Sequence, residues 1–327
     1  MKNTNSKKMA IVAIIDTGYR SYDYEKELFT GMGYELQIFQ GERVDIPAKK
    51  KLAMKAEGIL VRDTPIGEEV FEGAPDLKFI VRYGTGYDNI DVEAATERGI
   101  KVANVQGYGN HSVSDHALAL MFACIRGIPT GEKNVLTSFG KPPFPEVFEL
   151  HDKTLGIIGL GRIGGTLCDK ARYLFSRVLA ADPYIPDEKF ERHGAEKSDL
   201  ENLLQKSHVI SLHCNLTDET MHLLNREAFS MMGQCPVVIN TSRGPVIDAN
   251  ALLEAVDERR IHSAGIDVYE NEPVDQRQEG LVSHPRIITT GHYAWYSDAS
   301  IGILQRRAAD NLAAMLKGEI IENCLNP

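Results

Sequence analysis

Short apolar, β-branched segments alternate with amphipathic segments along the whole chain, which predicts an α/β protein with mostly parallel sheets. The segments before residue 110 that predict strands are Ala10–Ile15, Glu35–Phe39, Gly58–Val61, Lys78–Val81 and Lys101–Val105. The segments after residue 150 that predict strands are Thr154–Ile158, Val178–Ala181, Val209–Leu212, Pro236–Asn240, Ser263–Val268 and Arg286–Thr289. Two such groups, each with helical patterns between its strands, predict two doubly wound domains.

The helical patterns show how these two domains are connected. Ser112 and Ser114 are the predicted N-caps of an apolar helix that runs to about Arg126, before Gly127. A final helix over about Ser297–Lys317 follows the last predicted strand and is long enough to return to the first domain. We therefore expect residues 1–106 and 297–327 to form one domain, with a second domain of residues 107–296 inserted into it.

Composition and charge limit the possible classes of protein. The chain has 327 residues, 43% hydrophobic and 25% charged, which is typical of a globular protein with two domains. A net charge of −10 with both signs interspersed argues against a nucleic-acid partner, and the longest apolar run, Ala117–Ile125, is too short to span a membrane. Five scattered cysteines predict free thiols and a cytoplasmic location. His111 and His116 lack the H-E-x-x-H pattern, so no metal site is expected.

The most specific motif is Gly159-Leu160-Gly161-Arg162-Ile163-Gly164, which follows an apolar strand and opens a helix. In this context the three glycines permit a tight turn, close approach to a pyrophosphate and packing of the helix on the strand. Asp182 ends the next strand, where its carboxylate can bind both ribose hydroxyls and repel a 2′-phosphate. The predicted cofactor is therefore NAD.

Three polar residues, Arg243, Glu272 and His292, follow predicted strands at their carboxyl ends, where open α/β sheets bind ligands. A guanidinium can hold a carboxylate and polarise the neighbouring carbonyl. An imidazolium can protonate that carbonyl oxygen while a carboxylate orients the imidazole. His213 also follows a strand, and we interpret it as a structural or cofactor-side residue, together with Cys214 and Thr241 on the cofactor side.

From about Gly58 to Lys317, these motifs resemble in kind and order the D-specific 2-hydroxyacid dehydrogenase family, and most closely its C-terminal-binding-protein branch. The resemblance implies that Arg243, Glu272 and His292 are catalytic and that Asp267 contacts the nicotinamide. It implies a substrate site formed by Arg82, Tyr83, Gly84, Thr85 and Trp295. It also implies a homodimer formed through the helix after Ser112.

The predicted fold is thus a Rossmann NAD-binding domain inserted into a flavodoxin-like substrate domain. The predicted activity is the NAD-dependent interconversion of a 2-oxo acid and its D-2-hydroxy acid, a small-molecule substrate. Two alternatives stay open: an NAD(H)-sensing co-regulator of the C-terminal-binding-protein type, and a hydroxypyruvate or glyoxylate reductase.

Overall fold

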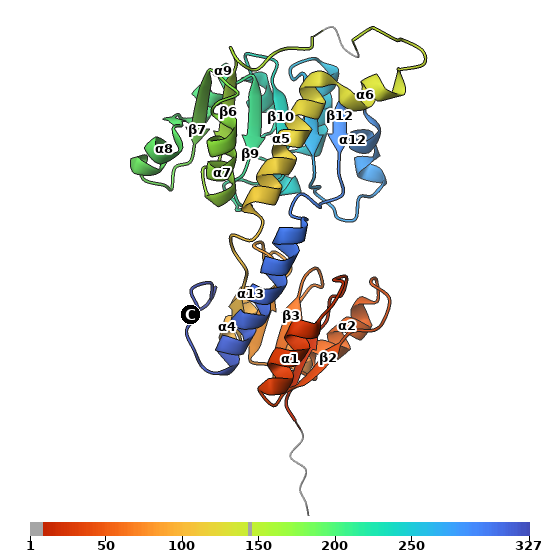
Figure 1. The fold of residues 1–327 in the computed structure, drawn as a ribbon, viewed down its shortest axis with the longest axis vertical. Coiled ribbons are helices and arrows are strands. Elements are labelled where there is room, and N and C mark those ends of the chain that lie inside the picture. Colours follow the sequence, from red (N-terminus) through yellow and green to blue (C-terminus); the bar gives the residue numbers. More distant parts are fainter. Residues whose placement is uncertain (1–8, 143–145) are drawn as a thin grey trace, which may run out of the picture. The chain divides into compact units, whose positions relative to one another are not determined.

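The computed structural model describes residues 9–142 and 146–327, which form two compact units. Unit 1 contains the residues up to Tyr108 and those from Ser297 onward, and unit 2 is Gly109–Tyr296. Each unit has its own parallel sheet with helices on both faces (Figure 1).

The sheet of unit 1 has the order β2-β1-β3-β4-β5, and every neighbouring pair of strands is parallel. Its strands are β1 (Ile11–Ile14), β2 (Glu35–Ile38), β3 (Gly58–Val61), β4 (Phe79–Arg82) and β5 (Lys101–Ala103). This is the strand order of flavodoxin-like folds, in which ligands bind beyond the carboxyl ends of the strands.

Helices from both ends of the chain cover the sheet of unit 1. The long helix α13 (Asp298–Leu316) packs on β3 and β4 beside α1 (Asp23–Gly31). Gly58 permits this approach, because a Cβ at that position would lie 2.9 Å from Leu312 Cδ1. The helices that contribute buried side chains to the core with β1 and β3 are α2 (Ile46–Ala53), α3 (Glu68–Gly73) and α4 (Val92–Glu97).

The sheet of unit 2 has the order β12-β11-β10-β9-β6-β7-β8, again with every neighbouring pair parallel. Its strands are β6 (Thr154–Ile158), β7 (Arg177–Ala181), β8 (Glu196–Lys197), β9 (Val209–Leu212), β10 (Val237–Asn240), β11 (Ser263–Ile266) and β12 (Ile287–Thr289). The order of the first six strands along the chain is that of a Rossmann fold, and β12 extends it by one strand. The predicted fold class is therefore confirmed.

Two cores lie on the two faces of this sheet, because successive side chains of a strand point to opposite faces. Val237 and Ile239 of β10 pack with the helices α5 (Asn110–Arg126) and α7 (Arg162–Ala171). Val238 packs in the other core. The helices that supply this second core are α9 (Leu200–Lys206), α10 (Arg226–Ser230), α11 (Ala249–Asp257) and α12 (Glu279–Ser283). The remaining helices of unit 2 are α6 (Ile128–Lys133), α8 (Asp187–His193) and the two short 3-10 helices η1 (Gly244–Val246) and η2 (Gln276–Gln278).

The predicted caps of α5 are wrong. The helix begins at Asn110, so Ser112 and Ser114 lie inside its first turns, and the N-cap position is held by Gly109 without a side-chain bond. The Ser114 hydroxyl instead donates to the carbonyl of His111. At the other end Gly127 terminates α5 in the left-handed region, with φ 60°. Among the described residues, no helix combines the length and the apolar character needed to cross a membrane.

Candidate active site

The glycine loop between β6 and α7 has a shape that only glycine permits at two positions. Gly159 has φ +88°, and a Cβ there would lie 2.6 Å from the backbone nitrogen of Cys214. A Cβ on Gly164 would lie 2.0 Å from the carbonyl oxygen of Gly159. By contrast, a Cβ on Gly161 would meet no atom within 4 Å, which leaves open space directly before the N-terminus of α7.

The surroundings of this loop fit a dinucleotide. The N-cap of α7 is Gly161 and makes no side-chain cap bond, so the backbone N–H groups of Arg162 and Ile163 at the helix start suit a pyrophosphate. The Asp182 carboxylate accepts from Leu160 N at 2.9 Å and from Tyr184 N at 3.1 Å, which holds the acid beside the loop. Its remaining lone pairs suit the ribose hydroxyls of a bound NAD.

Two buried polar atoms near the ends of β9 and β10 also fit a ligand. Thr241 Oγ1 and His213 Nδ1 lack a hydrogen-bond partner within the described part of the chain. Buried polar atoms are rarely left unpaired in folded proteins. A bound cofactor is one partner that could satisfy them.

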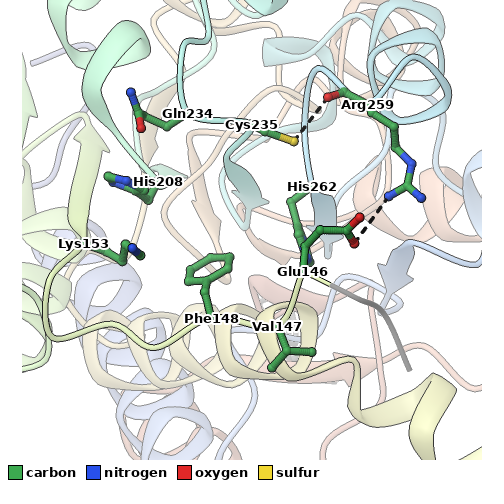
Figure 2. A pocket seen from close by; sticks show the side chains of 9 residues that line it. All are labelled: Glu146, Val147, Phe148, Lys153, His208, Gln234, Cys235, Arg259 and His262. Carbon is green, nitrogen blue, oxygen red and sulfur yellow. Dashed lines mark hydrogen bonds and ion pairs between the residues drawn. The ribbon is translucent and has the colours of Figure 1, made fainter. Parts of the chain in front are cut away.

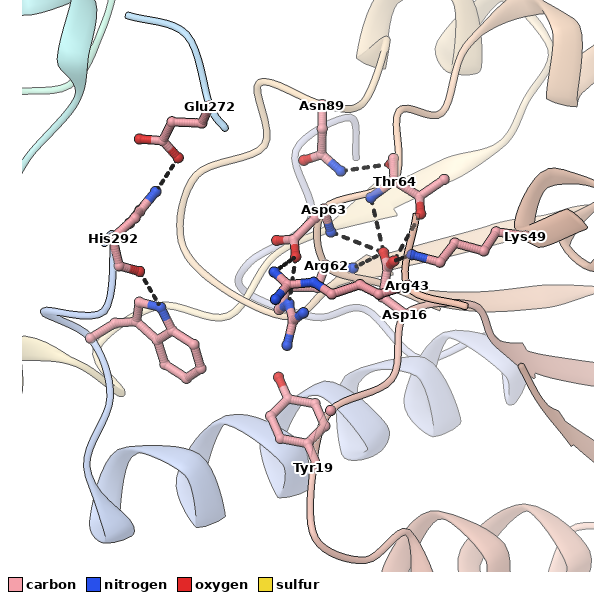
Figure 3. A network of polar contacts seen from close by, with 12 residues as sticks. Asp16, Tyr19, Arg43, Lys49, Arg62, Asp63, Thr64, Asn89, Glu272 and His292 are labelled. Atoms are coloured by element: carbon pink, nitrogen blue, oxygen red, sulfur yellow. Dashed lines mark hydrogen bonds and ion pairs between the residues drawn. The ribbon is translucent and has the colours of Figure 1, made fainter. Parts of the chain in front are cut away.

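A carboxylate and an imidazole meet in unit 2 although they are 20 residues apart. Glu272 follows β11 and His292 follows β12, and parallel neighbouring strands bring these loops to the same edge of the sheet. His292 Nδ1 lies 2.5 Å from Glu272 Oε2 (Figure 3). Burial opposes ionisation of Glu272, but the hydrogen bond and charge of His292, the bond from Tyr269 N and the charge of Arg243 together outweigh it and lower the pKa of this carboxyl group. The pair therefore consists of a carboxylate and an oriented imidazole, whose other nitrogen is Nε2.

The loop that carries His292 holds the residue in a strained conformation. His292 has φ 54°, in the left-handed region that residues other than glycine adopt only uncommonly. Its backbone N–H donates to the carbonyl of Asp267 at 2.8 Å, and its own carbonyl accepts from Trp295 Nε1 at 3.1 Å. Glu272 is held in turn by a bond from Tyr269 N at 3.0 Å. Strain of this kind persists only where the surrounding structure determines it, and it occurs often at functional sites.

Arg243 lies at the end of β10, immediately before η1. Its Nη1 donates to the carbonyl of Ser242 at 2.7 Å, and its carbonyl accepts from Asn240 Nδ2 at 2.9 Å. Its positive charge is among the influences that lower the pKa of Glu272. The three sequence-predicted catalytic residues thus follow three neighbouring strands of one sheet.

His213, the other histidine that follows a strand, contacts a serine, whereas His292 contacts a carboxylate. Its Nε2 lies 2.8 Å from Ser211 Oγ, and burial lowers its pKa to about 4. An imidazole with this pKa is neutral at pH 7 and is therefore a poor donor of the proton that carbonyl reduction requires. Burial likewise raises the pKa of the neighbouring Cys214 to about 11, so that residue stays a thiol.

The predicted substrate loop lies in unit 1, where it follows β4. The phenol ring of Tyr83 is in the core and its hydroxyl donates to Glu25, while its backbone N–H bonds to Val61 O at 2.7 Å. Gly84 has φ +142°, a conformation that residues with a side chain rarely adopt, and Arg82 Nη1 lies 1.5 Å from the place that a Cβ would take. The Arg82 guanidinium therefore lies over this loop. The Thr85 hydroxyl donates to Val105 O, which ties the loop to the segment after β5.

Two residues beside this loop were missed by sequence reasoning. Arg62 directly follows β3, and Arg82 is the last residue of β4. An arginine at the carboxyl end of each of these two strands was the sequence feature that could have identified Arg62. Tyr19 follows β1, and its ring packs against Tyr83 at 5.2 Å between centroids. The Tyr19 hydroxyl is buried, without a hydrogen-bond partner in the described residues, and burial raises its pKa to above the usual range. These residues place additional polar groups at the carboxyl edge of this sheet.

A cavity of about 350 Å³ lies elsewhere in unit 2 (Figure 2). Lys153, His208 and Cys235, which line it, precede β6, β9 and β10 by one or two residues. These are the amino ends of the strands, whereas the glycine loop, Arg243, Glu272 and His292 follow carboxyl ends. The cavity is therefore separate from the predicted cofactor and catalytic residues.

A Rossmann unit with a dinucleotide loop, and an oriented histidine–carboxylate pair at the same edge of its sheet, define the class of nicotinamide-dependent oxidoreductases. Comparison with known proteins identifies the family. Residues 118–294 match the model of the D-isomer specific 2-hydroxyacid dehydrogenase NAD binding domain. The chain belongs to this family of NAD-dependent D-2-hydroxyacid dehydrogenases, as predicted, and its cofactor is NAD.

The relatives are named for several different activities. The chain is 35% identical to a glyoxylate reductase of Korarchaeum cryptofilum over 302 residues. The aligned region covers 90% of each of the two chains. It is 36% identical over 311 residues to a D-3-phosphoglycerate dehydrogenase of Archaeoglobus fulgidus, covering 94% of this chain and 56% of that one. The structure of the D-lactate dehydrogenase of Aquifex aeolicus with NAD and lactic acid matches with a TM-score of 0.86, 26% identity, and 97% and 99% coverage. The more specific likeness to the C-terminal-binding-protein branch stays a prediction.

Proposed function

We propose that this chain interconverts a 2-oxo acid and its D-2-hydroxy acid, with His292 as the acid and base, Glu272 as its partner and Arg243 as the carboxylate clamp. The observation that carries the proposal is the 2.5 Å contact between His292 Nδ1 and Glu272 Oε2 on a loop that constrains the imidazole. NAD(H), when bound, accepts or supplies the hydride at substrate C2.

The proton path follows from this pairing. During reduction, His292 gives the proton on Nε2 to the substrate carbonyl oxygen and keeps the proton on Nδ1, which bonds to Glu272. The carboxylate orients the ring and stabilises its charged form without taking up a proton itself. Arg243 supplies a fixed positive charge for the substrate carboxylate and the polarised carbonyl. In oxidation the neutral imidazole accepts the hydroxyl proton.

Substrate binding in this proposal also uses Arg82, Gly84 and Thr85 of unit 1 and Trp295 of unit 2. Asp267 is the proposed contact of the nicotinamide amide. The Tyr83 side chain is best regarded as a support, because its ring and hydroxyl are in the core.

We expect NADH oxidation, followed by absorbance, with at least one 2-oxo acid from a panel of glyoxylate, hydroxypyruvate, pyruvate and an aromatic 2-oxo acid. Typical enzymes reach a kcat on the order of 10 s⁻¹. Glyoxylate is the first choice because several relatives are named glyoxylate reductases. Tight NADH binding without turnover of any member would contradict the proposal and favour an NAD(H)-sensing role.

We also propose a homodimer formed through α5 and the segment that follows it, which extends from the edge of unit 2 (Figure 1). The segment after α5 carries exposed large apolar side chains, including Leu136 at 97% and Phe139 at 89%. Clustered exposed apolar residues of this kind are typical of protein interfaces. We expect the protein to elute at twice its chain mass of 36.3 kDa, and the double variant Leu136→Glu, Phe139→Glu to elute as a monomer.

The matched control for this experiment is Ile320→Glu, because Ile320 is 98% exposed but lies near the C-terminus in unit 1. It should leave the mass by light scattering unchanged. A wild-type monomer, or a double variant that still dimerises, would show that this surface is not the interface.

A further inference from the structure

Three side chains connect α5 to the loop that carries His292. His116 of α5 places Nε2 3.0 Å from Thr290 Oγ1, and the Thr290 hydroxyl donates to Asp267 Oδ1 at 2.6 Å. A threonine hydroxyl has one hydrogen to donate. Because that hydrogen goes to the carboxylate, His116 Nε2 must be the donor in the first bond. His116 therefore donates to Thr290, and Thr290 donates to Asp267.

Asp267 is the residue that shapes the loop. It is fully buried, and its carboxylate accepts from Tyr293 N at 3.1 Å and from Ala294 N at 2.9 Å. Its backbone carbonyl accepts from His292 N at 2.8 Å. One aspartate thus binds three successive backbone N–H groups, which fixes the left-handed conformation of His292. The orientation of the Asp267 carboxylate in turn depends on the short bond from Thr290.

His116 is a rigid support for this arrangement. Its neighbour Ala117 and, one turn later, Leu120 are buried in the core between α5 and the sheet of unit 2. The imidazole also packs edge-on against Tyr293, with 5.2 Å between ring centroids and an angle of 79°. It therefore contacts the loop on both sides of His292, through Thr290 before it and Tyr293 after it.

We infer that His116 is a positioning residue: acting through Thr290 and Asp267, it sets the place of His292 relative to the substrate carbonyl. The catalytic consequence rests on the proposed function, whereas the structural consequence does not. Displacement of a catalytic group by about 1 Å can reduce turnover about 100-fold. Loss of the support should therefore lower kcat more than it weakens NADH binding.

Trp295 makes the position of the loop measurable without turnover. It is the only tryptophan of the chain, and its Nε1 donates to the carbonyl of His292. Fluorescence emission and acrylamide quenching of Trp295 thus report on the loop directly. We expect His116→Ala and Thr290→Val to increase the quenching of Trp295 and to lower kcat about 10- to 100-fold, with the KM for NADH within about 3-fold of wild type.

Conservative variants and a matched control separate positioning from general damage. Thr290→Ser keeps the hydroxyl and His116→Gln keeps a donor, so both should recover most of the kcat and the wild-type quenching. The control is His193→Ala, which removes another histidine of unit 2 with similar side-chain exposure, 17% against 18% for His116. His193 pairs with Asp169 at 3.0 Å, and its removal should change neither readout.

The outcomes are distinct. Unchanged Trp295 quenching in both His116→Ala and Thr290→Val would overturn the inference, whatever the activity. Altered quenching with wild-type kcat would overturn the claim that the support matters for turnover. Should the wild-type protein reduce no 2-oxo acid, the proposed function fails, and the fluorescence comparison still tests whether His116 positions the loop.

Discussion

Replacing His292 by alanine will reduce kcat by about 10²- to 10⁴-fold, which is the usual contribution of a general acid or base. The loss follows from the proton path, because the imidazole of His292 is the group that the Glu272 carboxylate orients. NADH binding should stay close to wild type, since the glycine loop and Asp182 lie on other strands. Steady-state kinetics with the best 2-oxo acid and NADH fluorescence titration measure the two quantities.

Glu272→Gln provides a graded comparison for this variant. An amide oxygen still accepts from His292 Nδ1 but carries no negative charge, so the fall in kcat should be smaller than for His292→Ala. His193→Ala is again the control, because its ring pairs with Asp169 at a distance from Glu272 along the sheet. Retained activity in His292→Ala would transfer the acid–base role to His213, despite its lowered pKa.

Replacing Asp16 by alanine will reduce the free energy of unfolding of unit 1 by about 3–5 kcal/mol, which is the usual cost of removing one partner of a buried ion pair. Asp16 and Lys49 are 1% and 2% exposed, and Asp16 Oδ1 lies 2.7 Å from Lys49 Nζ (Figure 3). The variant leaves the ammonium group buried without its counter-charge. Three backbone N–H groups, those of Arg62, Asp63 and Thr64, also lose their acceptor.

The same network predicts the direction of a pH effect. Burial opposes ionisation of Asp16, but the bonds from Lys49, Thr64 and Arg62 lower its pKa from 3.8 to about 2. A lowered pKa stabilises the folded state above the unfolded-state pKa, and this contribution is lost as pH falls from about 4 towards 2. Urea unfolding followed by circular dichroism at pH 7 and pH 3 should therefore show a smaller difference between wild type and Asp16→Ala at pH 3.

Two further variants test the cause of this effect. Asp16→Ala combined with Lys49→Met should recover part of the lost stability, because both buried charges are then removed. Arg43→Ala breaks an exposed pair with Asp63 in the same region and should cost less than about 1 kcal/mol. Equal losses for Arg43→Ala and Asp16→Ala would show that burial is not the reason for the effect.

Local patterns predicted the elements that carry the site. The strand at Thr154–Ile158, the glycine loop after it and the strand at Val209–Leu212 have the predicted bounds, because apolar runs and glycine spacing report local structure. Aspartate is a residue type that favours the N-cap, and Asp248 caps α11, where its side chain accepts from Asn250 N and Ala251 N. The caps of α5 failed because serine also bonds to helix carbonyls, as Ser114 does. The two-residue edge strand β8 carries too little periodicity to be recognised.

By itself, the sequence determined the α/β class, the dinucleotide loop and the family, since these depend on residue types at short spacing. Only the tertiary structure decided which side chains meet. Glu272 joins His292, Asp16 joins Lys49, and His116 reaches Asp267 through Thr290, at separations of 20 to 174 residues along the chain. The tertiary structure also decided that the Tyr83 ring lies in the core. The physical reason is that strand order and sheet packing bring distant segments together, and spacing along the chain does not encode that order.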